Sequence, residues 1–562
     1  MLRPTLLASA VLASALTVRA GAQPPAPDLI IHHARIYTAV DAHPAAAALA
    51  IRGDRLVAVG QDAEILALKG AATQVVDLGG RTVVPGLTDA HGHFTNLGSS
   101  LQRLDFRGLT SYDAIVAMVK ARAATARPGE WILGRAWDQN LWKNKAFPTH
   151  DKLDAAAPNN PVYLTRVDGH AGLANAKAMQ LAAVTRATEA PAGGRLIRDA
   201  NGNPSGVFVD GAQELVAAKI PPESDALLDE QILLADKECR RLGLTMVHDA
   251  GNTKRAIDAY KRLADAGTLQ TRIYAMVRGS LADLAPFFKA GPIANYHDYH
   301  VIVRAIKIIA DGALGSRGAA MLEDYSDEPG NKGLLTTPPE EVYAQTLAAS
   351  KAGFQTCIHA IGDRANREVL DVFARVQKEV PGSKSLRMRD EHAQILNPQD
   401  IPRFAQLSVI ASMQPTHCTS DMPWVPARIG QKRTADGAYV WQKLMKSGVV
   451  LASGSDFPVE QPNPMLGLYA AITRQDVNGN PPGGWAPDQR MTRMEALKSF
   501  TINAAYAAHM EKELGTLEGG KLADLVVLSG DVMTEPAKDI LTTTVIKTMI
   551  GGRWIYGSGA QR

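Results

Sequence analysis

The chain has 562 residues, of which 46% are hydrophobic and 21% charged, a balance typical of a folded globular protein rather than a disordered one. Its formal net charge is only +3, from 60 basic and 57 acidic residues, which argues against a nucleic-acid partner or an acidic membrane surface. The three cysteines, Cys239, Cys357 and Cys418, are too few for a disulfide framework, so stability must come from the core.

The N-terminus has the pattern of a secretory signal peptide. A basic start at Arg3 precedes an apolar stretch over 5–18, and Ala20-Gly21-Ala22 offers a small-residue cleavage site. The stretch is too short for a membrane span. We therefore expect a periplasmic or secreted protein whose residues 1–22 are removed after Ala22. The alternative is a disordered apolar tail on a cytoplasmic protein.

Short apolar segments separated by turn residues occur at both ends of the chain. Near the start they fall at 29–31, 48–51, 56–60 and 74–77, with Gly53-Asp54 in position for a hairpin turn. Near the end they recur at 525–528, 545–550 and 553–556. We expect one small composite β-sandwich built from residues 28–84 and 515–562.

Between these ends, strand-like and helical segments alternate, which is the pattern of an α/β barrel. The first strand candidate is the apolar run 82–87, continued through the residues up to 93. Seven more follow at 244–248, 272–277, 305–310, 355–359, 388–392, 407–413 and 449–453. Eight strands close a (β/α)8 TIM barrel, expected over 85–514, with an insertion at about 100–230 that we expect to lie over the barrel mouth.

His91 and His93 stand one residue apart at the end of the first strand candidate. Residues i and i+2 of a strand point to the same face, so the two imidazoles can reach one divalent ion. Neutral imidazole is the commonest protein ligand for zinc-like metals. Alone the pair is a moderate signal, because the same spacing also occurs on ordinary protein surfaces.

Other candidate ligands fall at the carboxyl ends of later strands. His359 ends the fifth strand, His392 ends the sixth, and Asp456 follows the eighth. The carboxyl ends of barrel strands meet at one rim, where barrel enzymes place their active residues. The sequence therefore predicts one cavity lined by four histidines and an aspartate.

Lys307 interrupts an apolar strand whose two faces should both be buried. A bare ammonium group there would cost several kcal/mol, so the lysine needs a partner or a chemical change. Carboxylation by CO2 would convert it to an anionic carbamate able to bridge two metal ions. The alternative is an ion pair with a carboxylate such as Asp311. Cys357, by contrast, is expected to be a small buried filler rather than a ligand.

Five motifs together resemble those of one family. They are Asp89-Ala90-His91-Gly92-His93, Lys307 with Asp311-Gly312-Ala313-Leu314-Gly315-Ser316-Arg317, His359-Ala360-Ile361-Gly362-Asp363-Arg364-Ala365, Asp390-Glu391-His392-Ala393-Gln394 and Gly454-Ser455-Asp456-Phe457-Pro458. The chain is identified as a member of the metal-dependent amidohydrolase superfamily. It most resembles the type-3 branch that includes N-substituted formamide deformylases, over roughly residues 28–560.

The resemblance implies a divalent metal site, with Zn²⁺ the expected ion. The implied ligands are His91, His93 and Asp456 on one metal and His359 and His392 on the other, with carboxylated Lys307 and a hydroxide as bridges. Two ions per chain are expected if Lys307 is carboxylated and one if it is not.

The resemblance also implies the reaction. Metal-bound hydroxide would attack an amide, formamide or related C–N bond, and Asp456 would act as proton shuttle to the leaving amine. The alternatives are a hydrolase of esters or cyclic amides on the same site, and a non-catalytic binding protein on this fold. The expected partner is a small-molecule substrate, with a homodimer left open, and neither nucleic acid nor a membrane anchor is expected.

Candidate substrate contacts come from the insertion and one barrel loop. Trp137, Asp138, Asp168 and His170 lie in the insertion and resemble elements of the type-3 branch. As alternatives, Trp137 belongs to a core and His170 is a hydrogen-bonded structural residue. Arg317 either contacts substrate or supports the residues that do.

Overall fold

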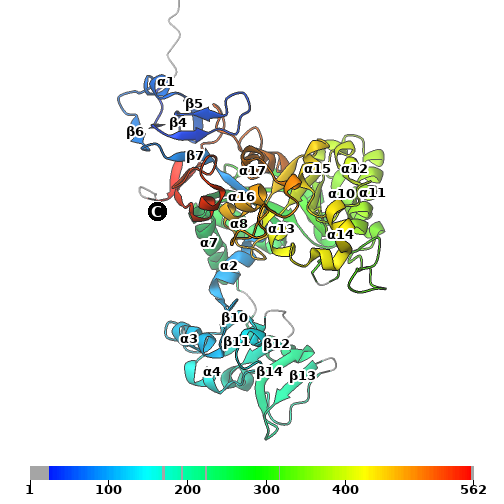
Figure 1. Ribbon diagram of the computed structural model, residues 1–562. Helices are drawn as coiled ribbons and strands as arrows, with labels where there is room; N and C mark the ends of the chain where they lie inside the picture. The colour runs from blue at the N-terminus through cyan, green and yellow to red at the C-terminus, as the bar shows by residue number, and fades with distance from the viewer. Residues whose placement is uncertain (1–24, 167–170, 192–193, 222–223, 316, 558–562) are drawn as a thin grey trace, which may run out of the picture.

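The computed structural model of the protein describes residues 25–166, 171–191, 194–221, 224–315 and 317–557. At its centre is a barrel of eight parallel strands (Figure 1). In sheet order they are β8 (Leu87–Gly92), β15 (Leu244–Asn252), β16 (Arg272–Val277), β18 (Val301–Ile309), β19 (Gln355–Ala360), β20 (Arg389–His392), β21 (Ile410–Met413) and β22 (Leu451–Ser453). The predicted (β/α)8 barrel is confirmed. The predicted signal peptide, Asp168 and His170 lie outside the described residues.

Helices surround the barrel. Their apolar residues recur every three or four positions, which gives each helix one apolar face to bury. In α8 (Lys254–Asp265), for example, Ile257, Tyr260 and Leu263 are buried, and the Thr253 side chain caps the helix by accepting a hydrogen bond from the backbone NH of Ala256. The other helices between the barrel strands are α7 (Asp225–Arg241), α9 (Leu281–Ala290), α10 (Pro339–Lys351), α11 (Asp363–Glu379), α12 (Ile401–Gln406), α13 (Pro415–Asp421), α14 (Val425–Gly437) and α15 (Trp441–Lys446). After β22 come α16 (Pro464–Thr473), α17 (Arg493–Ser499) and α18 (Ile502–Ala507).

The barrel closes between its last and first strands at the carboxyl rim. The backbone NH of Asp456 donates to the carbonyl of His91 over 2.7 Å, and the NH of His93 donates to the carbonyl of Phe457 over 2.8 Å. A Cβ atom on Gly454 would lie 2.4 Å from the backbone nitrogen of His91, so only glycine permits this approach. The closure brings the residues after β22 directly against the histidine pair.

Two smaller sheets stand beside the barrel. One has the order β5 (Arg55–Gly60), β4 (Ala48–Arg52), β1 (Leu29–His32) and β6 (Gln74–Asp77). The other has the order β25 (Arg553–Tyr556), β24 (Val545–Ile550), β23 (Leu525–Leu528), β7 (Thr82–Pro85), β2 (Arg35–Tyr37) and β3 (Ala45–Ala46). Both chain ends supply strands to this second sheet, and buried residues of both ends share one core.

The predicted first barrel strand is divided in the structure. Residues 82–85 form β7 and pair with β23 in the small sheet, whereas the barrel strand β8 begins only at Leu87. Gly86 separates the two, and a Cβ atom there would lie 2.2 Å from the Thr245 hydroxyl oxygen. The apolar run therefore serves two sheets, a division that hydrophobicity alone does not reveal.

The insertion after β8 forms its own lobe around a six-stranded sheet. Its strands, in sheet order, are β13 (Gly194–Arg198), β14 (Pro204–Asp210), β12 (Ala171–Ala174), β11 (Val162–Arg166), β10 (Ile132–Trp137) and β9 (Leu104–Asp105). Its helices are α3 (Tyr112–Ala123), α4 (Asp151–Ala156), α5 (Ala176–Leu181) and α6 (Glu214–Ala217). In Figure 1 the lobe extends beyond α2 (Phe94–Gln102) and has a separate core.

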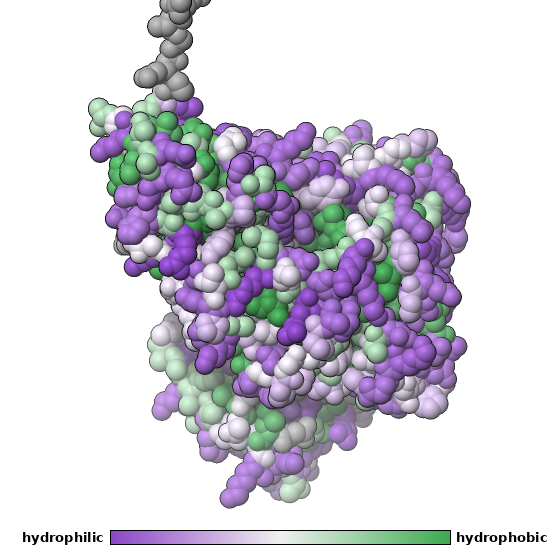
Figure 2. All heavy atoms as spheres, turned by 45° about the horizontal axis from the view of Figure 1, so that its top comes forward, coloured by the Kyte–Doolittle hydropathy of each residue, from purple (hydrophilic) through white to green (hydrophobic). Residues whose placement is uncertain are grey.

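The outer surface of the barrel is mostly hydrophilic in the view of Figure 2, with apolar residues showing on the lobe that holds the small sheets. Within the described part of the chain, no helix combines the length and apolar character needed to cross a membrane.

Candidate metal centre

The structure gathers the six predicted ligands at the carboxyl rim of the barrel. His91 lies near the end of strand β8, and His93 is the N-cap residue of α2. Lys307, His359 and His392 lie on β18, β19 and β20, and Asp456 follows β22. Neighbouring histidine rings are close, with centroids 4.8 Å apart for His91 and His392 and 4.5 Å apart for His359 and His392.

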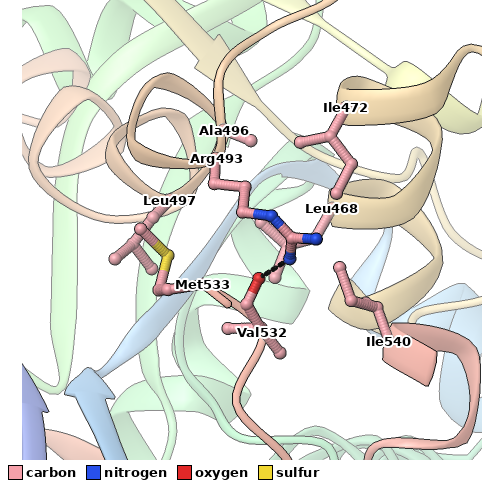
Figure 3. Close-up of a pocket in the computed structure, with 8 residues that line it drawn as sticks. All are labelled: Leu468, Ile472, Arg493, Ala496, Leu497, Val532, Met533 and Ile540. Carbon is pink, nitrogen blue, oxygen red and sulfur yellow. Dashed lines mark hydrogen bonds between the residues drawn. The ribbon is translucent and has the colours of Figure 1, made fainter. Parts of the chain in front are cut away.

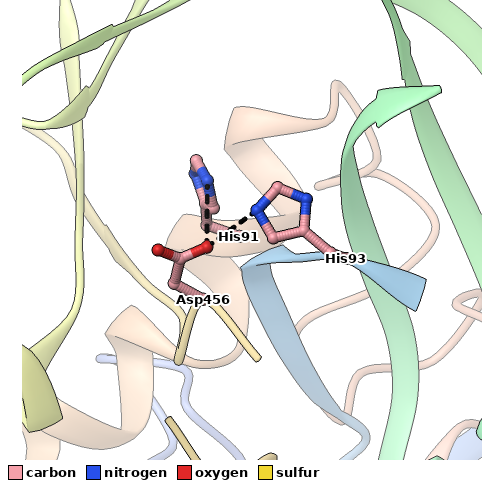
Figure 4. A group of neighbouring side chains, drawn as sticks. All are labelled: His91, His93 and Asp456. Carbon is pink, nitrogen blue, oxygen red and sulfur yellow. Dashed lines mark ion pairs between the residues drawn. The ribbon is translucent and has the colours of Figure 1, made fainter. Parts of the chain in front are cut away.

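One carboxylate oxygen of Asp456 faces both His91 and His93 (Figure 4). Its Oδ1 atom is 2.9 Å from Nε2 of His93 and 3.7 Å from Nε2 of His91. One ligand atom from each residue lies within 4.8 Å of the other two. Burial opposes ionisation of Asp456, but His93 and the surrounding imidazoles hold the pKa of its carboxyl well below the usual value. A carboxylate and two imidazoles converging in this way suit a divalent cation.

A buried carboxylate fixes the orientation of His91. Glu391 Oε2 lies 2.5 Å from His91 Nδ1, and both side chains are almost fully buried. Arg389, which is also buried, pairs with Glu391 at 2.7 Å and so keeps it ionised. An ionised carboxylate only accepts hydrogen bonds, so His91 donates through Nδ1 and keeps the Nε2 lone pair free for a metal.

His392 is held in the same tautomer by a different partner. Its Nδ1 lies 2.7 Å from the side-chain oxygen of Gln414, whose amide nitrogen donates to the carbonyl of Ser412. Because that second bond fixes which way the Gln414 amide points, His392 must donate through Nδ1. Its Nε2 lone pair is therefore available as a ligand.

Burial keeps three of the imidazoles, those of His91, His359 and His392, neutral, as metal binding requires. Desolvation, and secondarily the charge of Lys307, lowers the pKa of His91 to about 4 and that of His359 to about 3. The pKa of His392 is well below its usual value for the same first reason. These three histidines thus fit a divalent cation in charge state as well as in position.

Lys307 is buried at the floor of this cluster, with Nζ 3.0 Å from Nε2 of His91. Burial lowers the pKa of its amine. The alternative ion pair with Asp311 is not formed among the described residues. The Asp311 carboxylate instead accepts hydrogen bonds from the backbone NH groups of Ala320, Ile361 and Gly362, and it lies 3.5 Å from Nε2 of His359.

A further histidine at the rim was not among the sequence predictions. His417, in the first turn of α13, lies with Nε2 3.7 Å from Oδ2 of Asp456. Together with His392 and Asp456 it forms a second group whose ligand atoms lie within 4.8 Å of one another. His417 follows strand β21 by four residues, and the sequence prediction named no residue at the end of that strand.

Of the candidate substrate contacts, Trp137, Asp138 and Arg317 lie among the described residues, and each has a partner other than the predicted ligands. Trp137 is buried in the core of the insertion lobe, where its indole NH donates to the carbonyl of Leu164 and its ring packs against Trp142. This is the core position considered as its alternative. Asp138 pairs with Arg166 inside the same lobe, and Arg317 pairs with Asp327 through two 3.0 Å hydrogen bonds.

Asp249, in β15, holds the segment that carries His93 in place. Its two carboxylate oxygens accept hydrogen bonds from the backbone NH of Phe94 and the hydroxyl of Tyr260. The first bond fixes the start of α2, directly after His93. Cys357 is fully buried, as expected of a filler.

An apolar pocket elsewhere on the molecule carries no comparable chemistry (Figure 3). It lies between α16, α17 and the segment around Val532. Its charged residue, Arg493, donates to the backbone carbonyls of Val532 and Glu535. The pocket is thus a packing seam between the barrel helices and the C-terminal segment.

Residues 74–556 match the amidohydrolase family, which is most of the chain. The chain belongs to the amidohydrolase family. It is 35% identical to protein LONG AFTER FAR-RED 3 of Arabidopsis thaliana over 543 residues, covering 94% of this chain and 91% of that protein. It is 27% identical to the N-substituted formamide deformylase of Arthrobacter pascens over 535 residues, covering 93% and 97%.

Among solved structures, the amidohydrolase fold seen here is similar to that of an uncharacterised metal-dependent hydrolase from Pyrococcus horikoshii. The TM-score is 0.75 at 26% identity, with 91% of this chain and 99% of the other covered. Family membership and this likeness make the chain a metal-dependent hydrolase that acts on carbon–nitrogen bonds.

The contact between Glu391 and His91 can be tested by Glu391→Gln. The substitution keeps the shape but removes the charge that orients the imidazole, so we expect Zn²⁺ affinity to fall about 10- to 100-fold. Competition titration with a chromogenic chelator measures this affinity.

Glu323→Gln, which changes an exposed glutamate, is the matched control and should bind as the wild type does. Because Glu391→Gln also leaves Arg389 unpaired, Glu391→Asp serves as a second variant that keeps the charge but withdraws it from His91. Wild-type affinity in both folded variants would contradict the orienting role.

Proposed function

We propose that this amidohydrolase is an exported enzyme that cleaves the C–N bond of a formamide or related amide, with Asp456 as its proton carrier. The single observation that supports this most is the position of Asp456, an ionised and largely buried carboxylate between His91, His93 and His417. When bound, a divalent cation, with Zn²⁺ as our choice, supplies Lewis-acid activation of water and of the scissile carbonyl.

Residues of the chain orient the ligands and transfer the proton. Glu391 and Gln414 hold His91 and His392 in the tautomers that present Nε2 to the cation. Asp456 takes one proton from the attacking water as the new C–O bond forms. It returns that proton to the nitrogen as the C–N bond breaks, so the amine leaves neutral and the carboxylate is restored.

The Arthrobacter pascens relative, named for deformylation of N-substituted formamides, suggests the first substrates to try. We expect hydrolysis of N-alkyl or N-aryl formamides by the metal-loaded protein, measured as released amine. Asp456→Asn should lower kcat at least 100-fold, because the amide cannot accept the proton. Turnover confined to esters or cyclic amides would favour those alternatives, and no turnover with no bound metal would favour a binding protein.

We further propose that Lys307 is carboxylated and that the site then holds two cations. The support is geometric, since Nζ lies buried beside His91 and among the described residues is paired with no carboxylate. In the reaction Nζ attacks CO2, an N–C bond forms and one proton is released, which leaves a carbamate anion in place of a buried amine.

Elemental analysis tests the carbamate. Protein purified with bicarbonate should hold two metal ions per chain, and Lys307→Ala should hold one or none. Lys432→Ala removes an exposed lysine and is the control. Unchanged occupancy in Lys307→Ala, or in protein depleted of bicarbonate, would exclude a bridging carbamate.

Export is proposed from residues 1–22 alone. The composition of that segment supports cleavage after Ala22, so N-terminal sequencing of the protein from the periplasm or medium should begin at Gln23. Recovery of a chain that begins at Met1, in the cytoplasmic fraction, would contradict this location.

A further inference from the structure

His417 is the one imidazole of the metal centre that neither of the proposed cation positions uses. It projects from the first turn of α13, immediately beyond β21, and only 13% of its side chain is exposed. Its ring is stacked on that of His392, with centroids 6.0 Å apart and an interplanar angle of 16°. This packing holds the imidazole against the site.

The Nε2 atom of His417 is buried and has no hydrogen-bond partner among the described residues. It faces Oδ2 of Asp456 at 3.7 Å, slightly beyond hydrogen-bond length. The acidic residue of α13, Asp421, lies four residues further along the helix and already accepts hydrogen bonds from Tyr439 and Gln394. A buried polar nitrogen without a partner is costly, and the group that Nε2 faces, the ionised carboxylate of Asp456, can only accept hydrogen bonds, so Nε2 must be the donor.

The orientation of the Asp456 carboxylate must be fixed by a contact with another residue. Its backbone is held firmly, with φ at +57° and its NH bound to the carbonyl of His91. The last side-chain torsion of aspartate is broad, however, and does not by itself decide which oxygen faces which neighbour. In the structure Oδ1 faces His91 and His93, whereas Oδ2 faces His417.

We propose that His417 is a positioning residue that donates a hydrogen bond from Nε2 to Oδ2 of Asp456. This bond keeps Oδ1 directed at the cation and directs Oδ2, the oxygen that carries the proton, toward the leaving nitrogen. The inference rests on the proposed function of Asp456 as proton carrier and adds a residue to which no role has been assigned. His417 itself neither gains nor loses a proton in the reaction.

The test compares three substitutions at one position. His417→Ala removes the donor. His417→Gln places an amide NH close to the former Nε2, whereas His417→Asn places one close to the former Nδ1, away from Asp456. Exposed His43→Ala is the matched control. Each variant is assayed for Zn²⁺ stoichiometry, for Zn²⁺ affinity, and for kcat and KM on formamides whose leaving amines are graded in basicity.

Loss of the bond should lower kcat about 10- to 100-fold in His417→Ala and His417→Asn, with KM changed little and His417→Gln close to wild type. The loss should be largest for the most basic amines, because their departure depends most on the proton that Oδ2 delivers. Zn²⁺ affinity should fall about tenfold in His417→Ala, because one ligand is less well oriented, at unchanged stoichiometry.

Two results would overturn the proposal. One is His417→Ala with wild-type affinity and an unchanged dependence of kcat on leaving-group basicity. The other is loss of one zinc ion per chain in His417→Ala, which would make His417 a ligand together with His392. If the wild type hydrolyses no member of the series, the proposed function has failed, and the zinc affinities of the alanine and glutamine variants still decide whether His417 orients Asp456.

Discussion

A buried ion pair between Arg389 and Glu391 lies inside the barrel, directly beneath the metal centre, and the orientation of His91 depends on it. Arg389 also donates to the carbonyl of Ala90 and the hydroxyl of Ser412, and it contacts Nδ1 of His248, so four barrel strands meet on one guanidinium. Desolvating such a pair costs several kcal/mol, which only a dense set of hydrogen bonds offsets. Apolar residues could fill this space at less cost. The pair is explained instead by its effect on His91, since Glu391 presents a full negative charge to Nδ1 and so leaves Nε2, on the other side of the ring, to act as a ligand.

The position of the ligands also depends on closure of the barrel between its first and last strands. Asp89 accepts hydrogen bonds from the backbone NH groups of His91 and Ser455 and from the Ser455 hydroxyl, and so ties the first strand to the segment after the last. Asp456 and His392 both adopt left-handed backbone conformations, with φ at +57° and +78°. Such conformations cost about 1–3 kcal/mol each for residues other than glycine, and they persist where neighbouring structure determines them. Here that structure turns two ligands inward from the strand ends.

These constraints explain which parts of the site the sequence could predict. His359 follows a largely apolar segment, and Lys307 interrupts an apolar run, so both could be found with the barrel strands themselves. His392 follows charged residues and was found from its place at the end of the sixth strand candidate. The run 82–87 was predicted as one strand, although the expected domains divided it between 84 and 85, because the break at Gly86 depends on its closeness to Thr245, a residue far along the chain. His417 was missed because it stands on a helix just beyond its strand, where a histidine in a polar segment gives no contrast with its neighbours.

In the insertion the difficulty is the reverse: a residue named as a functional candidate, Trp137, lies in a core. Trp137 and Asp138 were named as substrate contacts because they resemble elements of the type-3 branch, yet Trp137 fills the core of the lobe, which was the alternative considered for it. A lobe with its own sheet cannot rely on the barrel for burial, so its largest apolar side chains are used internally. Rim residues such as His417 face no such demand, because the barrel core is complete beneath them. Within this fold, therefore, a polar side chain that lies buried at the rim and lacks a partner is a stronger indication of function than an aromatic residue in an added lobe.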